Sequence, residues 1–301
     1  MALDYYDKLR VKPGTKVDLS KHDPDFTGSF NGKAGKKAAK EQLAKNLAEI
    51  NALQTLMYAE QKHAQIFGMQ AMDAGGKDGT IKTVFGAINP QGCHTYSFKA
   101  PNTLEAQHDY FWRFHAKAPA LGEVVILNRT YYEDVLIVRL HDLVPERLKE
   151  QFTRASGAKT FDEKAFWESR YAQINNMERM FTENGTHILK FFLHISPEEQ
   201  LERFADRVFE SEKNWKLSPA DFDERAHWDD YQKLYEDALS KCSTDTAPWF
   251  IIPANKKWFR DLAVSEIVLQ HLKSLDMKYP EPKVDVEELK RKYFPNGHPG
   301  R

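Results

Sequence analysis

The chain has 301 residues, 41% of them hydrophobic, so it is long enough to bury a sizeable core and is not disordered throughout. Its 43 lysines and arginines nearly balance its 44 aspartates and glutamates, which excludes a strong overall attraction to nucleic acid or to anionic membranes. Because the two cysteines, Cys93 and Cys242, lack zinc or disulfide spacing, and no secretory signal or membrane-spanning run is apparent, we expect a soluble, cytoplasmic protein.

The order of apolar and polar segments predicts an alternation of helices and strands. Residues 1–38 are polar and irregular in pattern, and predict an arm laid over the surface. Apolar residues then recur at steps of three and four, which predicts a helix with one apolar face, carried by Leu47, Ile50, Leu53 and Leu56. Apolar runs predict strands at 65–70, 94–98, 123–127, 186–195 and 249–252, and helix-like segments follow, among them one from about Thr103 and one at 257–272.

Five strand and helix alternations with short connections predict an α/β fold, a three-layer αβα sandwich with a mainly parallel sheet. Residues 39–275 would form this domain, and residues 276–301 a polar tail. A helix start is marked most clearly at Ser196, where a Ser, a Pro and a Glu stand at the spacing of a capping box. Ligands of such sheets bind beyond the carboxyl ends of the strands, so the loops at those ends are the candidate site.

The turn after the first predicted strand, residues 71–80, is rich in glycine and has the length of a Walker A loop. Two positions depart from that pattern. Ala71 replaces the first glycine, and Asp78 stands where Ser or Thr normally follows the lysine. A strand before the turn and a helix after it still favour phosphate binding over an ordinary glycine turn.

The residue types in this loop suit an anion. Gly75, Gly76 and Gly79 let backbone N–H groups converge, and Lys77 adds a mobile charge. Asp73 is unsuited to direct anion contact, but it would serve to hold Mg²⁺ or to orient an attacking phosphate oxygen. The alternative is a solvated lysine on a glycine turn.

Polar residues also follow the third predicted strand. Asn128 stands where P-loop kinases carry a carboxylate near the metal, so that acid would come from Glu133 or Asp134 instead. Arg129 is placed to stabilise charge on a transferring group, and its alternative is a surface ion pair of little energetic value.

A later segment carries cations near the same edge, at Arg203, Arg207, Lys213 and Lys216. They form either the solvated face of a helix or a row that binds a chain of phosphates.

Seven segments in one unbroken order resemble the polyphosphate kinase 2 family, and more specifically its branch that phosphorylates nucleoside mono- and diphosphates. They are residues 70–80, 89–92, 97–101, 128–133, 189–195, 214–216 and 247–254. The resemblance implies a P-loop kinase-like fold, Mg²⁺ with Mn²⁺ as a substitute, a helical lid at about 203–225, a basic channel for polyphosphate and a homo-oligomer, either dimer or tetramer.

The resemblance also implies roles for individual residues. Asp73 and Lys77 would be central to catalysis, Arg129 would contact phosphates, and Asp73 with Glu133 or Asp134 would hold the metal. The residues predicted to bind nucleotide or polyphosphate are Ala74, Gly75, Gly76, Asp78, Gly79, Thr80, Asn128, Glu133, Arg203, Arg207 and Lys216.

The predicted function is reversible transfer of the terminal phosphate of inorganic polyphosphate to AMP and ADP, and also to GMP and GDP, giving ADP and ATP from the adenine nucleotides. One alternative is an ATP-dependent nucleotide kinase, which would use the same loop without a channel for a long anion. A non-catalytic module that binds polyphosphate or nucleotide is the other.

Overall fold

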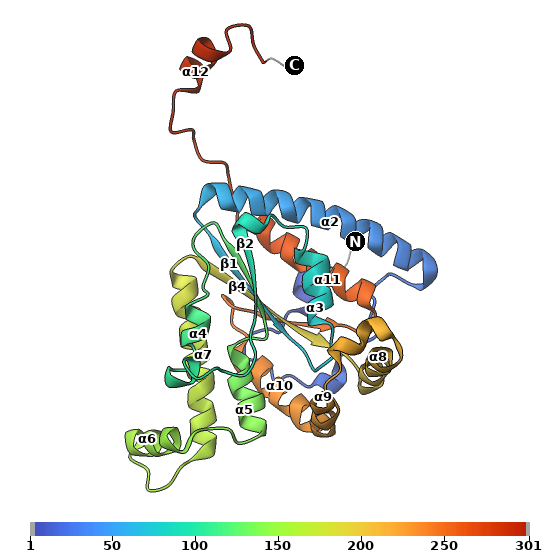
Figure 1. Ribbon diagram of the computed structural model, residues 1–301, viewed down its shortest axis with the longest axis vertical. Helices are drawn as coiled ribbons and strands as arrows, with labels where there is room; N and C mark the ends of the chain where they lie inside the picture. The colour runs from blue at the N-terminus through green and yellow to red at the C-terminus, as the bar shows by residue number, and fades with distance from the viewer. Residues whose placement is uncertain (1–3, 299–301) are drawn as a thin grey trace.

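A computed structural model describes residues 4–298 and contains one sheet of five parallel strands (Figure 1). The strands are β1 (Ala64–Gln70), β2 (Cys93–Ser97), β3 (Val124–Asn128), β4 (Thr186–His194) and β5 (Trp249–Pro253), and they lie in the order β2-β3-β1-β4-β5. Every neighbouring pair is parallel. The predicted parallel α/β sheet is therefore confirmed, and all five carboxyl ends meet at one edge.

Helices cover both faces of the sheet, as Figure 1 shows. One face packs against α2 (Gly32–Glu60) and α11 (Lys257–Ser274), and the other against α7 (Glu163–Glu183) and α10 (Trp228–Cys242). Because side chains alternate along a strand, Ile66 points into one core and Phe67 into the other. The three-layer sandwich is confirmed.

Shorter helices lie between these elements or at the ends of the described chain. They are α1 (Tyr5–Leu9), α3 (Lys77–Thr80), α4 (Trp112–His115), α5 (Ile137–Leu140), α6 (Glu146–Ser156), α8 (Pro197–Phe209), α9 (Pro219–Glu224) and α12 (Val286–Tyr293). Single turns are η1 (Leu19–Lys21), η2 (Ile81–Phe85), η3 (Pro90–Gly92), η4 (Glu105–Gln107), η5 (Tyr131–Val135), η6 (Ser211–Lys216) and η7 (Arg225–His227). Within residues 4–298 no helix combines the length and the apolar character that crossing a membrane requires.

The structure differs from the sequence-based expectation in two segments. The arm expected to be irregular contains α1 and the start of α2, and buried Tyr5 packs edge-on against Phe259, with ring centroids 5.4 Å apart. The helix expected from Thr103 is replaced by η4 and α4, because Asn102 and Glu105 bond each other's backbone N–H and close a single turn. The polar segment after residue 275 includes the exposed helix α12, which stands away from the body (Figure 1).

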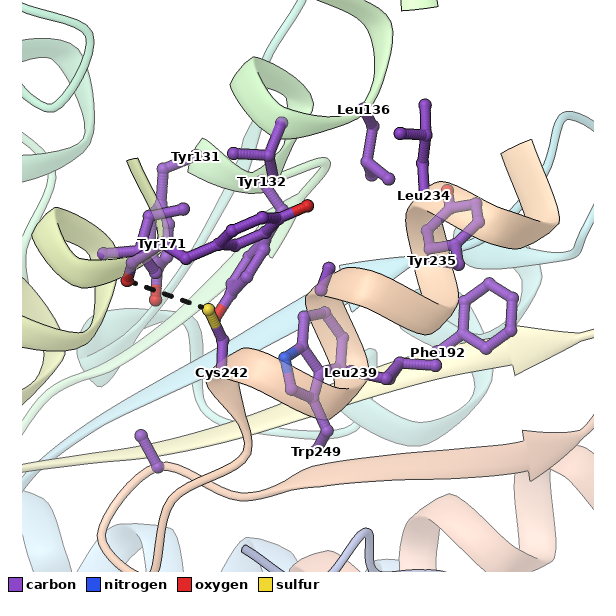
Figure 2. Close-up of a cluster of buried hydrophobic side chains, with 14 of the residues drawn as sticks. Tyr131, Tyr132, Leu136, Tyr171, Phe192, Leu234, Tyr235, Leu239, Cys242 and Trp249 are labelled. Carbon is purple, nitrogen blue, oxygen red and sulfur yellow. Dashed lines mark hydrogen bonds between the residues drawn. The ribbon is translucent and has the colours of Figure 1, made fainter. Parts of the chain in front are cut away.

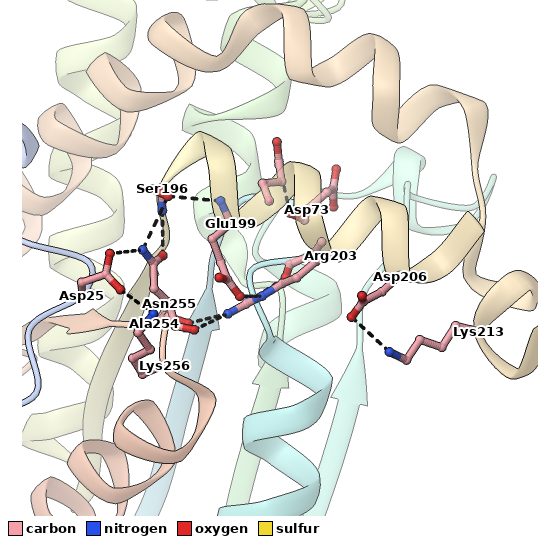
Figure 3. Close-up of polar contacts among 12 residues, drawn as sticks. Asp25, Asp73, Ser196, Glu199, Arg203, Asp206, Lys213, Ala254, Asn255 and Lys256 are labelled. Atoms are coloured by element: carbon pink, nitrogen blue, oxygen red, sulfur yellow. Dashed lines mark hydrogen bonds and ion pairs between the residues drawn. The ribbon is translucent and has the colours of Figure 1, made fainter. Parts of the chain in front are cut away.

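The capping box at Ser196 is only half formed (Figure 3). Ser196 Oγ accepts a hydrogen bond from the Glu199 N–H at 3.2 Å, as expected. The Glu199 carboxylate turns instead to Arg203, at 2.8 Å, and Asn255 accepts the hydrogen bond of the Ser196 N–H at 2.9 Å. Helix α8 is thus capped partly by the loop after β5.

A buried ion pair lies in the core between the sheet and α7. Lys190 and Glu178 are each 1% exposed, and Lys190 Nζ lies 2.6 Å from Glu178 Oε2. Tyr131 and Tyr132 both donate their hydroxyl hydrogens to Glu178, and the Cys242 carbonyl accepts from Lys190 at 2.7 Å. Figure 2 shows these tyrosines converging beside Cys242. Every charge in the group has a partner, which is what such burial requires.

Removing one member of this pair should cost more than removing both. The Lys190→Met variant leaves the Glu178 carboxylate buried without its cation, so its free energy of unfolding should fall by about 3–5 kcal/mol. Lys190→Met combined with Glu178→Gln should recover most of that loss, since no buried charge remains. Urea unfolding of both variants measures the difference, and equal losses would contradict the ion-pair interpretation.

A second test concerns His271, on α11 near the amino ends of the strands. Its Nε2 shares a 2.8 Å hydrogen bond with Gln65, and burial, followed by the charges of His187 and His63, lowers the pKa of His271 to about 3. The unfolded chain takes up this proton below about pH 6.5 and the folded chain does not, so stability present above that pH is lost as the pH falls.

Between about pH 6 and pH 4, the free energy of unfolding of wild type should decline more steeply than that of His271→Gln, by about 1.4 kcal/mol per pH unit. Urea unfolding of the two proteins across that range measures this difference. Parallel pH profiles would show that His271 titrates normally in the folded protein.

Candidate phosphate-binding site

The loop between β1 and α3 ends in two glycines at positions where a side chain would not fit. Gly76 has a φ of +103°, and a β-carbon placed there would lie 2.0 Å from Nη1 of Arg260. A β-carbon on Gly75 would lie 2.5 Å from the Ala71 side chain. Lys77 begins α3 directly after these glycines, and its Nζ donates to the Ala71 carbonyl at 2.8 Å. The loop therefore folds closely around its own lysine.

Asp73 faces Arg129 across the carboxyl edge of the sheet. Arg129 Nη2 lies 3.1 Å from Asp73 Oδ1, and the Arg129 backbone has a φ of +65°. Burial alone would lower the pKa of Arg129, but the Glu133 and Asp73 carboxylates outweigh it and raise that pKa. Burial lowers the pKa of Lys77, with the charge of Asp73 opposing that shift. The site thus holds opposite charges close together, partly out of water.

The two candidate metal-binding acids after β3, Glu133 and Asp134, lie in different surroundings. Glu133 lines the same cavity as Asp73 and Arg129, and burial raises its pKa against the opposing charges of Arg129 and Lys77. Asp134 lies 3.3 Å from Arg170, and it does not line that cavity. The structure therefore brings Glu133, and not Asp134, together with Asp73.

Asp78, at the position that departs from the Walker A pattern, is held by two other predicted residues. Asn128 donates to Asp78 at 2.8 Å, and Lys216 Nζ lies 3.6 Å from the other carboxylate oxygen. Burial would raise the pKa of Asp78, but the Asn128 hydrogen bond and the charges of Lys216 and Lys77 lower it. Through Asp78, η6 is tied to the glycine loop. Thr80, the last residue of α3, is fully buried.

The predicted row of cations is not an open surface row. Arg203 is 6% exposed and clamps the glycine loop to the loop after β5, donating to the Ala74 carbonyl at 2.9 Å and to the Ala254 carbonyl at 2.5 Å (Figure 3). Arg207 pairs with Asp221 at 2.8 Å. Lys216 lies 3.6 Å from Asp78, so both Arg203 and Lys216 contact the segment 71–80. The lid role of residues 203–225 stays a prediction.

Sequence reasoning missed two residues that contact the loop. Gln200 on α8 donates to the Asp73 carbonyl at 2.9 Å. Arg260, in the first turn of α11, lies against Gly76 and Gly79. Both belong to helices that begin just beyond strands β4 and β5, so the rule that ligands bind at the carboxyl edge was the signal that could have identified them.

A second cavity, of ≈ 220 Å³, opens beside Arg129 and Glu133. Aromatic rings from the loops after β2 and β3 contribute much of its wall, among them Phe98, Tyr110 and Phe114. The site therefore combines a charged centre with an apolar recess large enough for a planar ring system.

The site combines a glycine loop, Lys77 and Arg129 at the carboxyl edge of a parallel sheet. This combination defines a phosphotransferase with a P-loop kinase-like fold.

The family described as polyphosphate kinase 2 matches residues 33–164 and 156–280. An AMP/ADP-polyphosphate phosphotransferase from Meiothermus ruber is 44% identical over 94% of this chain and 98% of its own. An ADP-polyphosphate phosphotransferase from Rhodopseudomonas palustris is 43% identical over 91% and 92%, respectively.

Among solved structures, polyphosphate kinase 2 from Arthrobacter aurescens TC1 superposes with a TM-score of 0.86 at 37% identity, covering 96% of both chains. This chain belongs to the polyphosphate kinase 2 family. The resemblance inferred from seven sequence segments is confirmed.

The close approach at Gly76 gives a direct test of the loop. Gly76→Ala should reduce phosphate transfer by about 100-fold or more, because the methyl group would displace Arg260 and the loop N–H groups with it. Gly157→Ala is the matched control, since Gly157 also has a positive φ, of +69°, but open space around it. Steady-state kinetics of both variants, with circular dichroism to check folding, would refute the packing argument if both lost activity equally.

Proposed function

We propose that this protein transfers the terminal phosphate of inorganic polyphosphate to AMP and ADP, and also to GMP and GDP, in a reversible reaction. With the adenine nucleotides the products are ADP and ATP. The observation that carries the proposal is the placement of Asp73, Arg129 and Glu133 in one cavity beside the lysine-bearing glycine loop. Family membership supports it, because relatives that align over nearly the whole chain are named for this reaction.

The reaction needs positioning and charge neutralisation more than covalent chemistry. An oxygen of the nucleotide's terminal phosphate attacks the terminal phosphorus of polyphosphate in line. The bond from that phosphorus to the bridging oxygen breaks, and the shortened polyphosphate leaves with the electron pair. Lys77 and Arg129 stabilise charge on the equatorial oxygens of the transferred group, and Asp73 holds the guanidinium of Arg129 in place.

Mg²⁺ is part of the proposal, with Mn²⁺ as a substitute. Within residues 4–298 no three His, Cys, Asp or Glu side chains converge on one point. Mg²⁺ suits such a site, because it is bound by one or two carboxylates together with substrate phosphates and water. Asp73 and Glu133 would hold it, and it would supply further neutralisation of phosphate charge.

The aromatic cavity supports a nucleotide as acceptor. It shares Arg129 and Glu133 with the charged centre, so a nucleoside bound against this aromatic wall would direct its phosphates toward Arg129. We also propose a cytoplasmic location, consistent with two free cysteines, and a homo-oligomer, as the family resemblance suggests.

Phosphate transfer to AMP, ADP, GMP and GDP, with polyphosphate as sole donor and ATP excluded, tests the function. Formation of ADP and ATP from the adenine nucleotides is expected. Transfer only when ATP is the donor would establish an ATP-dependent kinase instead, and no transfer from either donor would leave a binding module.

Asp73→Asn and Lys77→Ala should each lower kcat by about 100-fold or more, because each removes a charge from the reacting centre. Thermal melting should show folded proteins in both cases. Asp276→Asn and Lys290→Ala, which change exposed residues outside the site, serve as matched controls. Activity retained in either site variant would overturn the assigned roles.

A further inference from the structure

Arg260 is a buried cation that the reaction as described above does not use. It is 3% exposed, and it lies in the first turn of α11, just beyond β5. A β-carbon on Gly76 would lie 2.0 Å from its Nη1, and one on Gly79 would lie 3.2 Å from its Nη2. The guanidinium thus approaches the backbone of the phosphate loop closely, with Nη1 directed at Gly76.

Only one edge of this guanidinium is occupied. Nε donates to Asp261 Oδ1 at 2.8 Å, and Nη2 lies 2.7 Å from the same oxygen. Within residues 4–298 no hydrogen bond reaches Nη1, the nitrogen that faces Gly76. Each guanidinium NH2 group carries two N–H donors, so Nη1 has donors free for a ligand at the phosphate loop.

A second buried cation faces the same point. The β-carbon position of Gly76 lies 3.3 Å from Nη1 of Arg203. Its nitrogens already donate to Glu199 and to the Ala74 and Ala254 carbonyls, so its main contribution at this point is positive charge. Burial lowers the pKa of Arg203, and the nearby charge of Arg260 lowers it further against the opposing Glu199. An anion between the two guanidinium groups would relieve this repulsion.

The in-line geometry of the transfer indicates which anion would bind beside Arg260. Arg260 does not line the cavity that holds Asp73, Arg129 and Glu133. In-line transfer requires the leaving oxygen to depart on the side opposite the attacking one. With the acceptor on the Arg129 side, the donor chain must run from Lys77 across the loop, toward α11.

We propose that Arg260 is a phosphate-binding residue for the donor, contacting a unit of the polyphosphate chain behind the one that is transferred. This inference rests on the proposed function for the identity of the donor. The chemistry it requires is that of a linear, doubly or more highly charged phosphate chain, which matches the open N–H edge of a fixed guanidinium. The competing explanation is that Arg260 only supports the loop.

Arg260→Gln and Arg260→Lys separate these explanations, with Arg291→Gln on the exposed helix α12 as the matched control. The KM for polyphosphate should rise by about tenfold or more in Arg260→Gln and less in Arg260→Lys, while the KM for AMP stays within about twofold. The dissociation constant of inorganic tripolyphosphate, measured by calorimetry, should rise in parallel. A fall in kcat or melting temperature with both donor constants unchanged would overturn the proposal.

The outcomes also distinguish this inference from the proposed function. Wild-type protein that fails to use polyphosphate overturns the function, whereas tripolyphosphate affinity that does not depend on Arg260 overturns the inference. If neither variant folds, a crystal structure of the wild-type protein with bound tripolyphosphate tests whether Arg260 contacts phosphate. A phosphate oxygen within hydrogen-bond distance of Arg260 Nη1 is expected, and phosphates bound only on the Arg129 side would refute the proposal.

Discussion

The ammonium group of Lys190 is buried away from water. The position of residues 129–133 depends on the partners that compensate this buried charge. Its partners come from α7, η5 and the end of α10, so one charge joins strand β4 to three other elements. Tyr131 and Tyr132 are fixed by this group, and they stand between Arg129 and Glu133 in the chain. Arg129 and Glu133, which line the charged cavity, are therefore anchored from the core.

The same segment is held from the opposite side by the strand that leads into the phosphate loop. Gln70, the last residue of β1, donates to the hydroxyl of Thr130 at 3.1 Å, and that hydroxyl also accepts from the Tyr132 N–H. The Arg129 N–H donates to the Met69 carbonyl at 3.2 Å. Because Gln70 and Thr130 are buried and the Arg129 N–H bonds to strand β1, the spacing between Lys77 and Arg129 is set by the sheet and not by flexible side chains.

Charge is distributed around the loop so that each of these cations is held in place by a defined partner. Arg203 is occupied by carbonyl oxygens, Arg129 by Asp73, and Lys216 by Asp78. Carboxylates that hold cations at fixed distances preorganise a positive site at little cost in reorganisation when phosphate charge develops. This explains why a loop for anions carries acidic residues at two of its positions.

The sequence by itself determined the five strands, the parallel sheet, the glycine loop and the family, because short apolar runs, glycines and the lysine between them can be recognised from neighbouring residues alone. It left Glu133 and Asp134 as equal candidates, since adjacent residues differ only in the direction their side chains take in the folded turn. Only the tertiary structure turned Glu133 toward Asp73 and Asp134 toward Arg170. It also buried Arg203 and placed Arg260 against Gly76, because contacts between residues more than 50 positions apart are set by how helices pack on the sheet, which no local pattern records.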